Sequence, residues 1–322
     1  MRAVQILGDV SLPKIVTNHA MDTPTPQNDE ILVRVHAAGI TGDEILWPEP
    51  YHCASRIPGH DISGVIFATG PEYHGSLRIG QDVFALLSAD RGQGQADYVI
   101  CLPNEVAPKP KSLTHVEAAA LPIPLLTAWE ATENHSNIKS GMRVLVTGAS
   151  GAVGVLFVQL AHQLAGAHVI ALGSSRNHDM LKRLGAQEVL DYTIPGWNRQ
   201  IARVDCVLDT VGGDVLAQAW EVVKEDGTIV TVGDPAPAWA FGRGVAAESI
   251  DHPHVRYIHF IVSPNADRMK KASEMLDSGC LEPLAVKSFP FSEAVEAWSY
   301  AQQRQRGHKA VIDFVGESSA KP

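Results

Sequence analysis

The chain has 322 residues, of which 45% are hydrophobic and 19% are charged, and its formal net charge is −10. This length is enough for two domains with their own cores, and the composition is typical of a soluble globular protein. The acidic balance disfavours nucleic acid and anionic membranes as partners, because both require clustered lysine and arginine. No apolar run reaches the roughly 18 residues that a membrane span needs.

The first residues and the spacing of the cysteines indicate in which cellular compartment the protein is expected. The opening stretch MRAVQILGDVSLPKIV lacks the long apolar segment of a secretory leader. The four cysteines are far apart and form no CxxC pair, so we expect free thiols. Together these features predict an intracellular, cytoplasmic protein.

Residues 1–116 are predicted to form a small β-rich domain. Short apolar stretches such as EILVRVHAAGI, GVIFATG, QDVFALL and ADYVICLP are separated by Gly, Pro and Asp, which is a pattern of strands and turns. The stretch LTHVEAAALPIPLLTAWEAT then predicts a helix, with Ser112 or Thr114 as its cap.

Residues 117–262 alternate strand and helix patterns. RVLVTGA, HVIALG, EVLDY, VDCVLDTVG and GTIVTVG are apolar strands, whereas AVGVLFVQLAHQLAG and NHDMLKRLG are helical. Apolar strands alternating with helices are typical of a parallel sheet covered on both faces. The predicted fold class is therefore α/β, with a doubly wound parallel sheet in this region.

Residues 263–322 give a helix, ADRMKKASEMLDSG, a strand, LAVKSFP, a second helix, FSEAVEAWSYAQQRQ, and a last strand, KAVIDFV. We expect this tail to return to the first domain, which would make that domain discontinuous.

The stretch VTGASGAVG places Gly148, Gly151 and Gly154 between a predicted strand and a predicted helix. Such a turn lets the backbone approach a pyrophosphate and directs the amides of the helix N-terminus toward it. Tight packing alone could also explain the glycines, but the strand–turn–helix context favours a dinucleotide site.

The end of the second strand of this region indicates which dinucleotide binds. An NAD site usually has an acidic residue here, about 20 residues after the glycines, and the stretch ALGSSRNH has none. Ser174, Ser175 and Arg176 instead offer donors suited to a 2′-phosphate, which predicts NADPH. Ser175 or Asn177 could equally cap the next helix, and both roles can coexist. Tyr192, at the end of the following strand, could line this pocket or serve packing only.

At this point the chain resembles the medium-chain dehydrogenase/reductase superfamily, and within it the zinc-free quinone oxidoreductase and enoyl reductase group. The resemblance is carried by EILVRVHAAGI, IPGHDISGVIFATG, ALPIPLLTAWEAT, VLVTGASGAVG, LGAQEVLDY, VLDTVGG, GTIVTVG and AVIDF, in the family's order and spacing. It implies a GroES-like β-rich catalytic domain plus a Rossmann domain, a nicotinamide cofactor, and hydride transfer from its C4 position.

The resemblance also implies the cofactor-binding residues. Thr127 would lie beside the nicotinamide, and Ser174, Arg176 and Tyr192 would hold the adenosine phosphate end. The full expected set is Thr127, Gly148, Ser150, Gly151, Ala152, Val153, Gly154, Ser174, Ser175, Arg176, Tyr192, Val211, Val232, Gly233, Phe260, Ile261 and Val262.

The Gly-His-acid triplet at His60 raises the question of zinc. A catalytic zinc needs three protein ligands, and in the zinc-dependent relatives the two other positions correspond to Thr41 and to a residue of PIPL. Neither position offers a ligand, so only His60 and Asp61 remain, and we expect no metal. His60 is then either a substrate-polarising group or a turn histidine bonded to the backbone. Asp43, Glu44 and Asp61 could tune a nearby pKa if they faced a cleft, but we favour a role as turn caps for all three.

A cleft without a metal suits reduction of a polarised C=C better than oxidation of an alcohol. Thr41, Tyr51 and His60 are the candidate catalytic donors, and a tyrosine hydroxyl can protonate an enolate. The predicted function is an NADPH-dependent reductase of an enone or enoyl group, with an NADPH-dependent quinone reductase as the alternative. A non-catalytic NADPH-binding protein is a third hypothesis. The expected partner is a small molecule with a conjugated carbonyl or a quinone, and a homodimer is left open.

Overall fold

The computed structural model describes residues 1–233, 235–242, 244–303 and 307–316. The chain divides into two compact units, one formed by Met1–Leu126 with Ser263–Pro322 and the other by Thr127–Val262. The first division falls within helix α3 (Pro122–Glu130), ten residues beyond the boundary expected at residue 116. Residues 304–305, the end of the helix predicted in the tail, lie outside the described residues.

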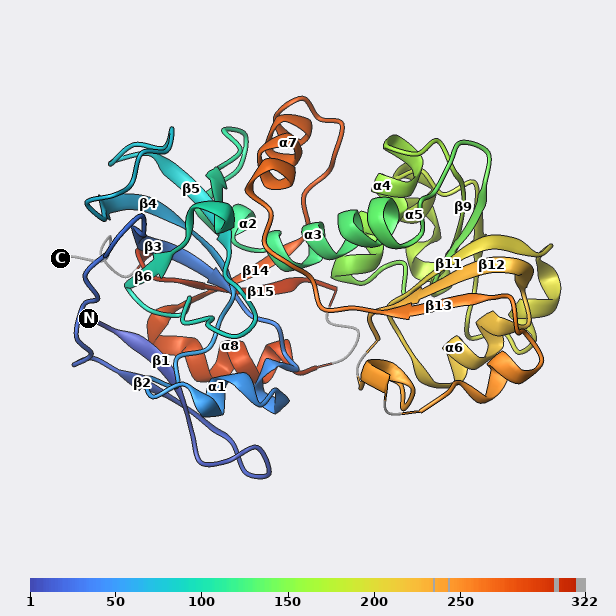
Figure 1. Ribbon diagram of the computed structural model, residues 1–322, viewed down its shortest axis with the longest axis horizontal. Coiled ribbons are helices and arrows are strands. Elements are labelled where there is room, and N and C mark those ends of the chain that lie inside the picture. The colour runs from blue at the N-terminus through green and yellow to red at the C-terminus, as the bar shows by residue number, and fades with distance from the viewer. Residues whose placement is uncertain (234, 243, 304–306, 317–322) are drawn as a thin grey trace. The chain divides into compact units, whose positions relative to one another are not determined.

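The first unit is built mainly of strands (Figure 1). They are β1 (Ala3–Leu7), β2 (Lys14–Asn18), β3 (Ile31–Gly39), β4 (Asp61–Thr69), β5 (Asp82–Leu86), β6 (Tyr98–Cys101), β7 (Val106–Pro108), β14 (Val286–Pro290) and β15 (Lys309–Asp313). The main sheet has the order β14-β15-β3-β4-β5-β7, with β6 also paired to β3, and β1 and β2 form a separate antiparallel pair.

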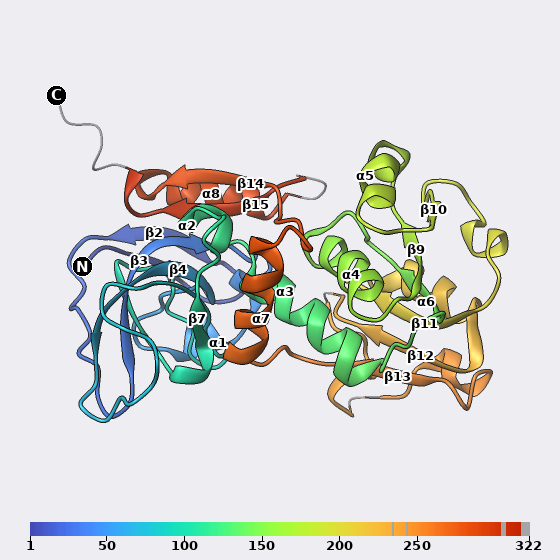
Figure 2. The same ribbon diagram turned by 90° about the horizontal axis from the view of Figure 1, so that it is seen from above.

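The tail of the chain completes this sheet. Strand β15 pairs antiparallel with β3, with Val311 opposite Gly39, and β14 pairs parallel with β15. Helix α8 (Ala294–Ala301) packs on β15 and β2 (Figure 2), and its Trp298 is buried in a core with Val33, Ile62 and Phe314. Apolar residues of the tail therefore close the core that the first 126 residues begin. The unit also contains the helices α1 (Glu49–His52), α2 (His115–Ala118) and α7 (Ala266–Asp277).

The single helix expected over residues 113–132 is two helices. Thr114 caps α2, its hydroxyl accepting from the Glu117 amide while the Glu117 carboxylate accepts from the Thr114 amide. The first helix ends at Ala118, and after three non-helical residues α3 begins at Pro122. Proline has no amide hydrogen to donate to the preceding turn, so it starts a helix more readily than it continues one.

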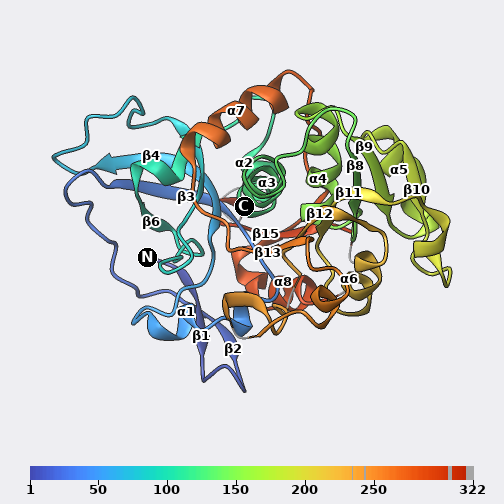
Figure 3. The ribbon, with the colours of Figure 1, turned by 45° about the vertical axis from the view of Figure 1, so that its right-hand side comes forward.

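The second unit is a parallel sheet of order β10-β9-β8-β11-β12-β13 with helices on both faces, which confirms the doubly wound fold. Helices α4 and α5 lie on one side of the sheet and α6 on the other (Figures 1 and 3). The strands are β8 (Arg143–Val146), β9 (His168–Leu172), β10 (Glu188–Leu190), β11 (Val204–Asp209), β12 (Val223–Thr231) and β13 (Arg256–His259). The helices are α4 (Ala152–Gln163), α5 (His178–Arg183) and α6 (Gly213–Trp220).

None of the helices in the described part of the chain combines the length and the apolar character that crossing a bilayer requires.

Candidate functional site

The glycine-rich turn joins β8 to α4 and has no room for side chains. Gly148 has a φ of +57°, and a Cβ on Gly154 would lie 2.2 Å from the Gly148 carbonyl oxygen. Gly151 is the N-cap of α4 and is exposed, and Ala152 and Val153 after it are partly exposed. The first amides of a helix have no partner within it, so they are available to an anion. The turn thus fits the diphosphate of a dinucleotide.

A buried carboxylate ties this turn to the two neighbouring strand ends. Asp209, at the end of β11, accepts hydrogen bonds from the hydroxyls of Thr147 and Thr231, the latter at 2.7 Å. It also accepts from the Gly212 and Val211 amides, at 3.0 and 3.2 Å. Asp209 is fully buried, so this network fixes the carboxyl ends of β8, β11 and β12 to one another.

Three of the expected cofactor residues meet beside this network. A Cβ on Gly148 would lie 2.9 Å from the Val211 side chain, and one on Gly233 would lie 3.0 Å from the Val211 carbonyl carbon. The Val211 side chain is 43% exposed and is therefore accessible to a ligand. Val232 precedes Gly233, and its amide bonds to the Asp209 carbonyl. We did not single out Asp209 from sequence, although an acid ending an apolar strand, as in VLDTVGG, is a usable signal.

The expected 2′-phosphate residues follow β9. Ser174 precedes a 3₁₀ turn, Ser175–Asn177, and its hydroxyl accepts from the Asn177 side-chain amide at 3.3 Å. Arg176 is exposed, and Tyr192 is 42% exposed. The Asp191 carboxylate accepts from the Ser175 amide at 3.0 Å, and hydrogen bonds from Thr193 hold its pKa below the usual range. The Asp191 carboxylate therefore lies close to the predicted phosphate position. The sequence alone does not indicate this proximity.

The other expected nicotinamide neighbours belong to the second unit. Thr127 is 5% exposed within α3. Phe260 follows β13 and its ring lies 4.3 Å from that of His135, whereas Ile261 is 56% exposed.

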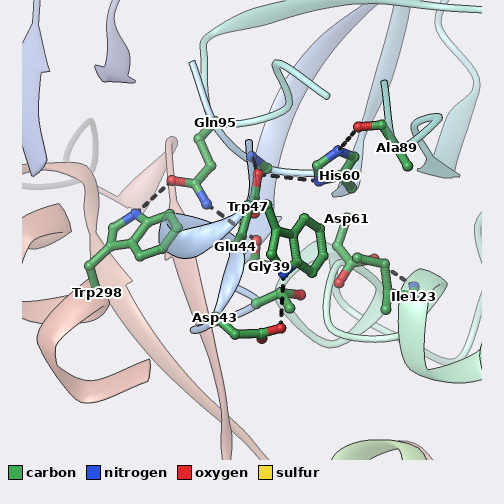
Figure 4. A network of polar contacts seen from close by, with 12 residues as sticks. Gly39, Asp43, Glu44, Trp47, His60, Asp61, Ala89, Gln95, Ile123 and Trp298 are labelled. Carbon is green, nitrogen blue, oxygen red and sulfur yellow. Dashed lines mark hydrogen bonds and ion pairs between the residues drawn. The ribbon is translucent and has the colours of Figure 1, made fainter. Parts of the chain in front are cut away.

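His60 lies in the first unit, immediately before β4, and both of its ring nitrogens face acceptors (Figure 4). Nδ1 is 3.2 Å from Oε1 of Glu44, and Nε2 is 3.3 Å from the Ala89 carbonyl oxygen. Oε1 of Glu44 already accepts from the Gly59 amide, and a carbonyl oxygen can only accept, so these contacts favour an imidazole that carries a proton on both nitrogens. Burial lowers the pKa of His60, but the Glu44 carboxylate, the Ala89 carbonyl and Asp61 together outweigh it and the net pKa is raised.

The carboxylate of Glu44 is as buried as its partner. The Glu44 and His60 side chains are 1% and 3% exposed, and Oε1 of Glu44 also accepts from the Gly59 amide at 2.6 Å. Glu44 is therefore one half of a buried ion pair rather than a turn cap. A direct contact between His60 and a substrate would require one of its two internal contacts to break.

A second buried ion pair lies next to the first. Nζ of Lys309, at the start of β15, is 3.2 Å from Oδ2 of Asp61 and donates to Oγ1 of Thr41 at 3.1 Å. Oδ1 of Asp61 accepts from the Ile123 amide at 2.6 Å, at the N-terminus of α3. Burial raises the pKa of Asp61 above its ordinary value, and Lys309, the Ile123 amide and His60 offset this only in part. Lys309 is a site residue that we did not single out from the sequence.

Tyr51, the third candidate donor, is engaged elsewhere. Its hydroxyl donates to the Ile45 carbonyl at 2.6 Å, and its ring packs on the core of the first unit. Desolvation raises the pKa of Tyr51, which makes it a weaker acid. Protonation of a substrate by Tyr51 therefore stays a prediction that requires this hydrogen bond to be exchanged.

The residues at the family's zinc position do not fit a zinc ion. Thr41 receives a hydrogen bond from an ammonium group, and both nitrogens of His60 are directed at acceptors, so neither offers a free lone pair in the observed arrangement. Across the described ranges, no group of three His, Cys, Asp or Glu side chains could hold a metal.

Comparison with known proteins covers nearly the whole chain. The model of the alcohol dehydrogenase GroES-like domain matches residues 27–111, and the model of the zinc-binding dehydrogenases matches residues 184–312. A mitochondrial NAD(P)H oxidoreductase of Mus musculus is 30% identical, over 89% of this chain and 82% of that protein. The 2-methylene-furan-3-one reductase of Solanum lycopersicum is 31% identical, over 95% of this chain and 76% of that protein.

Among solved structures, the quinone oxidoreductase from Coxiella burnetii is similar throughout. It is 28% identical with a TM-score of 0.81, and the match covers 98% of this chain and 100% of that one.

Proposed function

This chain belongs to the medium-chain dehydrogenase/reductase superfamily of oxidoreductases, and from that premise we propose that it is an NADPH-dependent, zinc-independent reductase of a conjugated C=C bond. The substrate is an enone or an enoyl compound, whose carbonyl oxygen gains negative charge when the β-carbon is reduced.

The observation that carries the proposal is the pair of ion pairs at the zinc position. Glu44–His60 and Lys309–Asp61 occupy the region where zinc-dependent relatives would polarise an oxygen. A reductase with this arrangement must stabilise the developing oxyanion with hydrogen-bond donors, and Thr41 is the partly exposed hydroxyl among these groups. Its charge-assisted contact with Lys309 makes it suited to that task.

NADPH supplies the hydride when it is bound. Gly148, Gly151 and Gly154 leave space for its diphosphate, and the amides that open α4 donate to the phosphate oxygens. Ser174 and Arg176 bind the 2′-phosphate, while Val211 and Gly233 support the dinucleotide at the strand ends. The names of the relatives also support this chemistry, since one is an NAD(P)H oxidoreductase and another a reductase of an exocyclic enone.

The direct test follows NADPH absorbance with a panel of enones, enoyl thioesters and quinones, using protein freed of metal by a chelator. We expect turnover of one or more conjugated carbonyl compounds, undiminished by the chelator. Turnover of quinones alone would favour the quinone reductase, as in the relative from Coxiella burnetii. Tight NADPH binding with no turnover of any acceptor would favour a non-catalytic binding protein.

The cofactor preference has its own test in Arg176→Ala. Loss of a charge-assisted contact to the 2′-phosphate costs about 1.5–3 kcal/mol, so the dissociation constant for NADPH should rise roughly ten- to hundred-fold. NADH binding should hardly change, because it has no 2′-phosphate. Lys182→Ala, which removes an exposed cation from the neighbouring helix α5, is the matched control. Equal losses for both dinucleotides would contradict the assignment.

A further inference from the structure

Lys309 is a buried cation that lies behind Thr41, the donor in the proposed function. Its side chain is 5% exposed, and lysine is almost never buried to this extent without a partner. Two groups lie at its ammonium, Oδ2 of Asp61 at 3.2 Å and Oγ1 of Thr41 at 3.1 Å. The carboxylate balances the charge, so the contact with Thr41 is additional to what neutralisation requires.

The chemistry of the two groups fixes the direction of the contact with Thr41. An ammonium group has three donors and no lone pair, so the hydroxyl oxygen must accept. The hydroxyl proton of Thr41 then points away from Lys309. Within the described residues no hydrogen bond uses that proton, and the Thr41 carbonyl is occupied separately by the Glu44 amide at 3.1 Å. Thr41 is also partly exposed, so a ligand can reach its hydroxyl.

The position of Lys309 is itself constrained. Asp61 is 1% exposed, and its other oxygen accepts from the Ile123 amide at 2.6 Å, so the carboxylate is held at the N-terminus of α3. A helix N-terminus favours a negative charge. With Asp61 held in this way, the ammonium has little freedom to leave Thr41.

We propose that Lys309 is a positioning residue that orients the Thr41 hydroxyl and strengthens it as a hydrogen-bond donor to the carbonyl oxygen of the substrate. A hydroxyl that accepts a hydrogen bond from a cation becomes a better donor, because hydrogen bonds in a chain polarise one another. The substrate class is therefore a compound whose reduction places charge on an oxygen next to Thr41. This inference rests on the proposed reductase function and adds the residue that acts behind the donor.

A purely structural role of Lys309 would have different consequences from the proposed positioning role. In that role the Lys309–Asp61 pair would only strengthen the attachment of β15 to the sheet, which backbone pairing with β3 already provides. Loss of Lys309 would then lower stability, and any loss of activity would be independent of the side chain at position 41.

The decisive experiment is a double-mutant cycle on the full-length protein with Thr41→Val, Lys309→Met and the combined variant. Turnover number, KM for the best acceptor from the panel, NADPH affinity and melting temperature are measured for each. Thr41→Val should lower kcat by up to about 10²-fold, as expected for loss of one oxyanion donor, and Thr41→Ser should retain most activity. Lys309→Met should lower kcat about ten-fold in the wild-type background and have almost no effect in the Thr41→Val background. NADPH affinity should be unchanged throughout.

Lys287→Met is the matched control, because it removes an exposed lysine from β14 in the same sheet. It should leave kcat unchanged. Where Lys309→Met does not fold, the same cycle is run with Lys309→Gln, whose amide can still donate to Thr41 but has no charge.

Losses that multiply in the double variant, or a Lys309→Met protein with wild-type kcat, would overturn the inference while leaving the reductase function intact. A folded wild-type protein that reduces none of the acceptors would overturn the proposed function, and the inference with it.

Discussion

His60 and His115 both lie against the main sheet of the first unit, His60 at the residue before β4 and His115 in α2. His60 faces a carboxylate at 3.2 Å and a backbone carbonyl at 3.3 Å. His115 instead faces the Ser63 hydroxyl at 2.8 Å and the ring of His36 at 4.4 Å, and its nearest carboxylate, on Asp82, is 3.6 Å away and 54% exposed. The imidazole of His60 thus has a close acceptor at each ring nitrogen, whereas that of His115 has a hydroxyl at Nδ1 and a second imidazole beside it.

These neighbours give the two histidines opposite pKa shifts. For His60, the Glu44 carboxylate, the Ala89 carbonyl and Asp61 together outweigh burial, and the pKa is raised. For His115, burial and the nearby His36 lower the pKa to about 4 in spite of Asp82. Burial alone therefore does not determine the charge of an imidazole, because the number and distance of the acceptors around it decide whether a proton is retained.

The largest expected effect comes from removing the acid that faces each histidine. Glu44→Gln leaves a buried imidazolium without its counter-charge, which typically costs about 3–5 kcal/mol. We expect about 3 kcal/mol, the lower end of that range, because the imidazole can respond by losing its proton. Asp82→Asn is the matched substitution at His115, and its exposed carboxylate should contribute no more than about 1 kcal/mol. Urea unfolding at neutral pH measures both, and equal losses would contradict the comparison.

A smaller effect should appear in the pH dependence of stability. The stabilisation from His60 is fully present below pH 6.5, its ordinary pKa, and is lost as the pH rises through the higher folded value. The stabilisation from neutral His115 is present above pH 6.5 and is lost as the pH falls toward about 4. The charged or titratable groups around His115 are His36, Asp82 and Lys109.

Unfolding free energies of wild type and His115→Gln at several pH values between 4.5 and 7 test the second half of this prediction. The wild type should lose more stability on acidification than His115→Gln does, since only the wild type must suppress protonation at this position. Parallel curves would show that folding does not lower the pKa of His115.

The sequence was informative where the signal is local. A strand, three glycines and a helix follow one another within about 20 residues, so the nucleotide turn at Gly148–Gly154 could be predicted and the doubly wound sheet with it. The Gly-His-acid triplet likewise identified His60 and Asp61 as unusual. The break between α2 and α3 could also have been foreseen from Pro122.

The partners of His60 and Asp61 could not be predicted in the same way. Glu44 is 16 residues before His60, and Lys309 is 248 residues after Asp61, so neither pairing leaves a trace in local periodicity. Acids near glycines usually cap turns, so the local sequence predicts that role for Glu44 and Asp61. Only the return of β15 to β3 brings Lys309 to Asp61 and Thr41.

The last prediction concerns the Ser63 hydroxyl. It faces Nδ1 of His115, whereas Nδ1 of His60 faces a carboxylate. Ser63 is fully buried and its hydroxyl donates to the Val83 carbonyl at 2.9 Å, so Oγ is left to accept from Nδ1 of a neutral His115. Ser63→Ala removes both hydrogen bonds and should cost about 1–2 kcal/mol, because each contributes about 1 kcal/mol. The acid-side loss of stability should persist, since burial and His36 still oppose protonation. If Ser63→Ala abolished that loss, the hydroxyl rather than burial would be what keeps His115 neutral.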